Sequence, residues 1–154
     1  WFFFSIGLVF WIVLMTIVFY RIFFHEPLPA KLTPTLFILI APPSVAFISY
    51  LALNNHQLDG FARVLYFFAL FLTLLLASNA LRFFRLPFAL SAWAYSFPLA
   101  AITIATFEMA HLNPGIFYPI LAGILLLVLN VIILLLAYRT LLAVKNRQIC
   151  QPEP

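Results

Sequence analysis

The sequence predicts an all-α integral membrane protein. Of its 154 residues, 66% are hydrophobic and only 8% are charged, whereas a soluble domain is about half apolar and about a quarter charged. The chain also contains five apolar stretches, each at least as long as the roughly 20 residues that a helix needs to cross a bilayer. Disorder is excluded because disordered chains are poor in aromatic residues, and 18% of this chain is Phe, Trp or Tyr.

Five segments are predicted to span the membrane. They are residues 1–24, 33–53, 61–82, 87–110 and 115–144. Residues 1–147 thus form a transmembrane helical domain, and residues 148–154 form a short polar tail. Strands of a membrane barrel would be about ten residues long with alternating polarity, but these runs are continuously apolar. Because the connections are short, consecutive helices should be antiparallel neighbours.

Polar or proline-containing stretches justify the end of each segment in turn. The segments end at residues 25–29, 54–56, Arg82, 111–114 and 145–147, respectively. Seven of the eight Lys and Arg residues lie on one side of the predicted membrane, namely Arg21, Lys31, Arg82, Arg85, Arg139, Lys145 and Arg147. The positive-inside rule therefore predicts an external N-terminus and a cytoplasmic C-terminus.

The predicted helices are of two kinds. The first, third and fifth are bulky and aliphatic or aromatic, without a proline at mid-membrane, as suits contact with lipid. The second and fourth have prolines at mid-membrane, Pro42 and Pro43 in one and Pro98 in the other. A proline removes a backbone hydrogen bond and kinks a helix. In lipid such a break belongs against protein or a water-filled cavity.

Small and hydroxyl side chains accompany these prolines. They include Ser44 on the second segment and Ser96, Thr103 and Thr106 on the fourth. With Leu99 between Ser96 and Thr103, spacings of three and four place the last three on one helix face. One interpretation is that both segments line a permeation path. The alternative is that small residues and prolines serve helix packing, as is common in membrane bundles.

The middle of each segment is free of charge, which bears on the kind of substrate. Proton-coupled carriers usually keep an ionisable residue within the membrane. A fixed cation would hold an anion tightly, whereas conduction needs weak sites. Partial positive charge from helix N-termini can serve instead. The pattern is therefore compatible with passive passage of small inorganic or organic anions, without a cofactor.

Other chemistries have weaker signals. Glu108 and His111 have the spacing of a di-iron Glu-x-x-His motif, but the other carboxylates of that motif are missing. The single cysteine makes no cysteine-based metal site, and the basic residues form no nucleic-acid-binding motif. No metal site, nucleic-acid partner or enzyme activity is predicted. Two alternatives stay open: a membrane-embedded metal or redox enzyme subunit, and a purely structural membrane bundle.

Phe97 precedes Pro98 near the membrane centre. A large apolar ring at the narrowest point of a path could close it. Phe is abundant in this chain, with 19 residues, so contact with lipid or core is the competing interpretation for Phe97.

The runs 93–101 (WAYSFPLAA) and 41–46 (APPSVA) resemble the tellurite-resistance/dicarboxylate transporter family. This family groups bacterial tellurite-resistance proteins with plant slow anion channels and fungal sulfite and malate permeases. The resemblance covers essentially the whole chain but only the C-terminal half of the family fold. It implies ten helices in five hairpins around a central pore, with the second and fourth segments inside and the other three outside.

The resemblance also implies an assembly and a gate. Family members are homotrimers with one pore per protomer, and the likeness to the bacterial members implies the bacterial inner (plasma) membrane. The phenylalanine that occludes the family pore corresponds to Phe97. Because the family fold has ten helices, we expect the first five to be missing from this chain.

Overall fold

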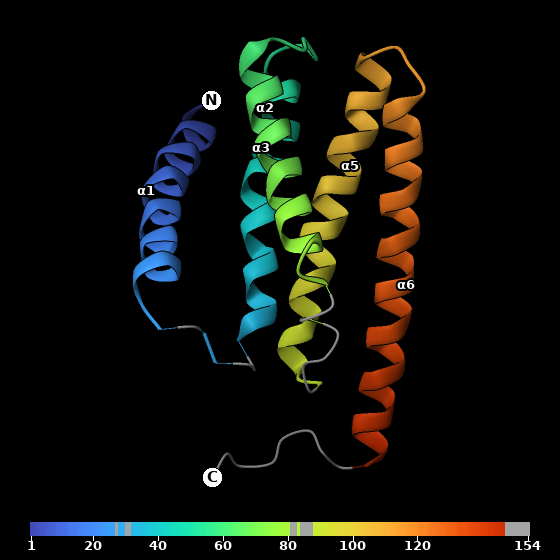
Figure 1. The fold of residues 1–154 in the computed structure, drawn as a ribbon. Coiled ribbons are helices and arrows are strands. Elements are labelled where there is room, and N and C mark those ends of the chain that lie inside the picture. Colours follow the sequence, from blue (N-terminus) through green and yellow to red (C-terminus); the bar gives the residue numbers. More distant parts are fainter. Residues whose placement is uncertain (27, 30–31, 81–82, 84–87, 147–154) are drawn as a thin grey trace.

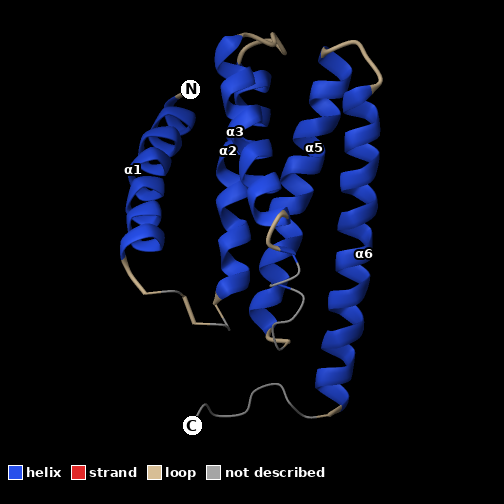
Figure 2. Ribbon diagram, in the orientation of Figure 1, coloured by secondary structure: helices blue, strands red, loops and turns tan. Residues whose placement is uncertain are grey.

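The computed structural model describes residues 1–26, 28–29, 32–80, 83 and 88–146. Their main elements are helices: α1 (Phe2–Phe24), η1 (Thr33–Ile40), α2 (Ala41–Leu53), α3 (Gly60–Ala77), η2 (Leu90–Tyr95), α5 (Ser96–Leu112) and α6 (Phe117–Lys145). Figures 1 and 2 show these helices as an elongated bundle with their axes roughly parallel. No strand occurs among the described residues (Figure 2). The predicted polar tail at 148–154 and the end of the third predicted segment lie outside the described part.

Five helical stretches are long and apolar enough to cross a membrane. They are Phe2–Phe24, Thr33–Leu53, Gly60–Ala77, Leu90–Leu112 and Phe117–Lys145. The all-α membrane class predicted from composition is confirmed. Figure 1 shows the α2–α3 and α5–α6 connections at the same end of the bundle, with successive helices running in opposite directions.

The two proline-containing spans change helix type along their length. In the first, the 3-10 helix η1 gives way to α2 at Ala41, so that Pro42 and Pro43 lie in the first turn of α2. In the second, η2 gives way to α5 at Ser96, and Pro98 lies in the first turn of α5. Backbone N–H groups in the first turn of an α-helix lack an intrahelical partner. Proline, which has no N–H, is therefore tolerated there.

The buried core lies where α2, α3 and α5 meet. Its large side chains, fully enclosed within the chain, include Phe47, Tyr66, Leu72, Ile102 and Met109. The helix pairs α5–α6, α2–α3 and α2–α5 pack most extensively. The two helices with mid-span prolines thus contact each other inside the bundle, and α3 and α6 cover them.

Helix α1 contributes little to this core. Only Met15 of α1 is buried, and Figure 1 shows the helix standing to one side of the others. Helix α6 is also mostly exposed along its length. Both surfaces are apolar, and lipid can solvate such surfaces without cost. These helices suit an outer layer, as predicted from their bulky aliphatic composition.

Candidate permeation site

Helix α5 has a buried and an exposed face. Its buried face carries Ile102, Ala105 and Met109, which belong to the core. Phe97 lies on the other side and is 63% exposed, although Pro98 next to it is buried. Ile104 is also exposed, at 52%. A large aromatic side chain in the first turn of an inner helix is thus presented away from the rest of the chain.

The predicted path-shaping prolines are placed differently from Phe97. Pro43 and Pro98 are buried, and Pro42 is partly exposed. Pro42 borders a cavity of about 220 Å³ between α1 and α2, together with Val45 and Ser49. Pro43 and Pro98 therefore lie within the packed part of the inner helices, and all three prolines lie where the change from 3-10 to α-helix takes place.

Three of the four predicted path-lining hydroxyl residues are buried. Ser44 donates to the carbonyl of Ile40 at 2.8 Å, Thr103 to Leu99 at 2.6 Å and Thr106 to Ile102 at 2.7 Å. A hydroxyl that donates to a carbonyl of its own helix needs no hydrogen-bond acceptor on another helix or on an ion. In this chain the face that carries Thr103 and Thr106 packs against neighbouring helices, and its lining of a path stays a prediction.

Ser96 is the partly exposed member of that set. Its Oγ donates to the carbonyl of Trp93 at 2.8 Å, across the junction of η2 and α5. Ser96 directly precedes Phe97 in the chain. The backbone turn that presents Phe97 is therefore stabilised by a local side-chain bond.

Sequence reasoning missed Tyr66 on α3. Its hydroxyl donates to Thr106 Oγ1 on α5 at 3.2 Å. Its ring lies 5.4 Å from that of Phe47 on α2 and 6.0 Å from that of Tyr118 on α6, measured between centroids. The phenol thus joins an outer helix to an inner one. A single polar aromatic in an otherwise leucine-rich segment was the available signal.

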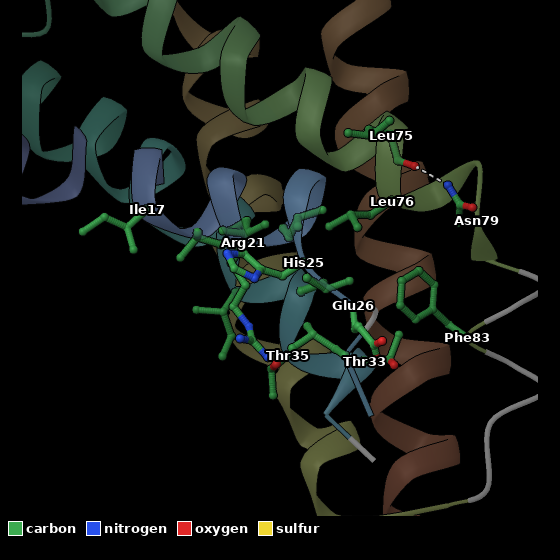
Figure 3. A pocket seen from close by; sticks show the side chains of 16 residues that line it. Ile17, Arg21, His25, Glu26, Thr33, Thr35, Leu75, Leu76, Asn79 and Phe83 are labelled. Atoms are coloured by element: carbon green, nitrogen blue, oxygen red, sulfur yellow. Dashed lines mark hydrogen bonds between the residues drawn. The ribbon is translucent and has the colours of Figure 1, made fainter. Parts of the chain in front are cut away.

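A larger cavity lies away from the predicted gate. It measures about 870 Å³ and lies between the end of α1, η1 and the end of α3. Figure 3 shows Arg21, His25 and Glu26 at the α1 side of this cavity, with Thr33 and Thr35 from η1 and Asn79 beyond α3. None of the predicted gate or path-lining residues contributes to its lining.

The described charged side chains lie toward the helix ends. Arg21, Arg139 and Lys145 occur late in α1 and α6. At the opposite end, Asp59 caps α3, and the backbone N–H of Ala62, followed by the hydroxyl of Tyr50, lowers the pKa of its carboxyl. Among the described residues, no three His, Cys, Asp or Glu side chains are grouped to hold a metal ion.

These features define a class of protein: a membrane helical bundle whose proline-containing inner helices are uncharged at mid-span and lie under an apolar outer layer. The family model described as voltage-dependent anion channel, SLAC1, matches residues 1–141. The chain belongs to this family. Its relatives are named as channels or transporters rather than as enzymes.

Three plant proteins illustrate the relationship. The S-type anion channel SLAH2 of Arabidopsis thaliana is 33% identical over 80% of this chain, and SLAH3 of the same plant is 32% identical over 92%. The guard cell S-type anion channel SLAC1 of Arabidopsis thaliana is 32% identical over 75% of this chain. The matched regions cover 24%, 22% and 20% of these relatives, respectively. The chain therefore spans about a fifth to a quarter of their length.

Proposed function

We propose that this chain supplies two inner and three outer helices of an anion channel whose pore Phe97 closes. The observation that carries this proposal is the exposure of Phe97. It projects from the first turn of α5 while the adjoining Pro98 is buried. The family model and the S-type anion channels support anion permeation as the function.

The gate would work by steric exclusion. A phenyl ring has no charge and offers no hydrogen bond to an anion, so a ring at a constriction excludes both the ion and its water. An apolar constriction of this kind can gate by dewetting. Opening would require the ring to move aside, which in turn requires α5 or its side chain to change conformation. Passage through the open state would be passive, without a cofactor.

The rest of the path would be shaped by the inner-helix prolines. Pro42, Pro43 and Pro98 each lie where a 3-10 segment gives way to an α-helix. Ser96, partly exposed beside Phe97, would contact the permeating anion. Ser44, Thr103 and Thr106 complete the proposed lining, and they would meet an anion only where the full pore opens the interface that now buries them.

The proposed setting is a larger assembly. The resemblance favours a ten-helix protomer in five hairpins, of which residues 1–147 would form the second half, and a homotrimer in the bacterial inner membrane. The cytoplasmic end would carry the C-terminal residues 148–154, as the basic residues favour. Tellurite resistance would be a phenotype of such a channel, without requiring tellurite to be its substrate.

The test is Phe97→Ala in the full-length channel, measured as anion current in planar bilayers or in voltage-clamped cells. Removing the ring should raise the conductance severalfold at unchanged protein amount. Phe71→Ala is the matched control because Phe71 is 55% exposed on the outer helix α3. Equal conductance of Phe97→Ala and the unsubstituted channel would contradict the gate.

A further inference from the structure

We infer that Tyr66 and Thr140, on two outer helices, position Phe97 by hydrogen bonding to its inner helix on either side of it. This inference rests on the proposed function of Phe97. It concerns what holds the gate in place. The two bonds are Tyr66 to Thr106, between α3 and α5, and Trp93 to Thr140, between η2 and α6.

The first bond, from Tyr66 to Thr106, holds α5 at a position C-terminal to Phe97. Tyr66 and Thr106 are both fully buried. Thr106 Oγ1 accepts from the Tyr66 hydroxyl at 3.2 Å and donates to the carbonyl of Ile102 at 2.7 Å. The hydroxyl of Thr106 is therefore held in one orientation by its own helix and offers its lone pair toward α3. Rotation of α5 would leave the Tyr66 hydroxyl unpaired in a low-dielectric interior, whereas Thr106 would keep its bond to Ile102 on its own helix.

The geometry of α5 turns this bond into a constraint on the gate. Thr106 follows Phe97 by nine positions in the same α-helix. At about 100° per residue, their side chains point to opposite sides of the helix, about 13 Å apart along the axis. Fixing Thr106 against α3 therefore directs Phe97 away from α3. This agrees with the 63% exposure of Phe97.

The second bond, from Trp93 to Thr140, holds the 3-10 helix η2 at a position N-terminal to Phe97. Trp93 Nε1 donates to Thr140 Oγ1 at 3.0 Å, and Thr140 Oγ1 donates in turn to the carbonyl of Leu136 at 2.7 Å. Trp93 also accepts at its carbonyl the bond from Ser96 Oγ. Residue 93 is thus attached to α6 through its side chain and to the start of α5 through its backbone.

Together the two bonds fix both ends of the segment that presents the ring. Helix α3 holds the α-helical part, α5, and helix α6 holds the 3-10 part, η2. Loss of either bond frees one end to rotate, while the aliphatic packing that holds the bundle together remains. We therefore expect loss of a bond to weaken closure rather than folding.

The test uses nearly isosteric variants of the full-length channel. Tyr66→Phe keeps the ring against Phe47 and Tyr118 but removes the donor, and Thr140→Val removes the acceptor for Trp93. Interhelical hydrogen bonds in membranes contribute about 0.6 kcal/mol on average, or about threefold in an equilibrium. Each variant should therefore raise the anion conductance by about threefold. Thr73→Val is the matched control, since the buried Thr73 hydroxyl bonds only the carbonyl of Ala69 on its own helix.

Epistasis with the gate separates positioning from general structure. In a Phe97→Ala background, Tyr66→Phe and Thr140→Val should add nothing, because no ring remains to be positioned. A second readout is the rate at which a thiol reagent labels Phe97→Cys, which should change when Tyr66→Phe is added and stay constant with Thr73→Val.

Each outcome has a separate meaning. Failure of Phe97→Ala alone to raise conductance rejects the proposed gate. A raised conductance with Phe97→Ala, combined with unchanged conductance and labelling in Tyr66→Phe and Thr140→Val, rejects the positioning role while keeping the gate. If Tyr66→Phe and Thr140→Val raise the conductance equally with and without the Phe97 ring, the positioning role is also rejected. The two bonds would then act elsewhere in the pore.

Discussion

The hydroxyl of Tyr50, near the end of α2, donates a hydrogen bond to the carboxylate of Asp59, which caps the N-terminus of α3. The same carboxylate accepts the backbone N–H of Ala62 at 2.9 Å and the side-chain amide of Asn54 at 3.2 Å. Asp59 therefore closes the α2–α3 hairpin from both sides. The short connection also contains two residues with positive φ, Asn55 and His56, as a tight reversal requires.

The Asp59 network predicts an acid-dependent loss of stability. Because the N–H of Ala62 and the hydroxyl of Tyr50 lower the carboxyl pKa below its ordinary value of 3.8, the ionised form stabilises the folded state. This contribution is complete above the unfolded-state pKa and disappears as the pH falls through the lowered folded-state pKa. The melting temperature of the unsubstituted protein should exceed that of Asp59→Asn near neutral pH, and the difference should shrink as the pH falls below 3.8 and through the lowered pKa.

Tyr50→Phe provides the companion measurement. It removes the hydrogen bond from Tyr50 to Asp59 but leaves the bond from the Ala62 N–H. The folded-state pKa of Asp59 should therefore be lowered less, and the acid-dependent loss of stability should begin at higher pH. The side-chain ring would still pack against Phe61, whose ring centroid lies 4.9 Å away. A difference between Asp59→Asn and the unsubstituted protein that is independent of pH would contradict the role of the carboxylate charge.

Phe47 should be a major contributor to stability. It is fully buried on α2 and packs against Tyr66. Phe47→Ala should lower the free energy of unfolding by about 3–5 kcal/mol, mainly through the cavity that it leaves. The lower part of the range is expected because the unfolded helices stay in lipid. Reversible unfolding in mixed micelles measures this loss. Phe3→Ala is the control because Phe3 is 85% exposed, and an equal loss would contradict the packing assigned to Phe47.

The spans could be predicted from the sequence because the cost of placing polar groups in lipid is a local property of the chain. The length of each apolar run and the charged residues near its ends are visible in the sequence itself. The junctions near Pro42 and Pro98 were likewise signalled by residues at the junction itself. The inner and outer assignment followed from the same prolines, and the packing of α2 against α5 agrees with it.

The side-chain partnerships could not be predicted, because they depend on which helices meet. Tyr66 lies in a leucine-rich run that indicates lipid contact, yet its partner Thr106 is 40 residues away. Spacing placed Thr103 and Thr106 on one face of α5, but spacing alone does not say whether that face meets a path or a neighbouring helix. In this chain the face is buried, as the helix-packing alternative expected.

The proposed orientation predicts which side each loop faces. A cysteine at Gln57, in the α2–α3 connection, should react with an impermeant maleimide added outside the cell. A cysteine at Asn146, after α6, should react only once the membrane is permeabilised. Both positions are exposed, so differences in rate report the side of the membrane. Labelling of Asn146→Cys in intact cells would contradict a cytoplasmic C-terminal end.

Pro98 should maintain the helix junction that orients the gate. It is the third residue of α5, where the missing N–H costs nothing. In Pro98→Ala the restored N–H could bond the carbonyl of Ala94, which would extend the α-helix backward into η2. The turn per residue would change from about 120° to about 100°. Over three or four residues, Trp93 would then rotate by about 60–80° relative to Phe97 and lose Thr140.

Pro98→Ala should therefore raise the anion conductance as Thr140→Val does, and the two substitutions together should not add. Pro119→Ala is the matched control, because Pro119 is also the third residue of its α-helix but follows a loop instead of a 3-10 helix. Its replacement restores an N–H with no preceding helix to extend, so the conductance should stay unchanged. Equal effects of Pro98→Ala and Pro119→Ala on the conductance would mean that a proline at the third position of a helix acts through general helix stability. An additive effect of Pro98→Ala and Thr140→Val would mean that the junction and the Trp93 bond act on the gate independently.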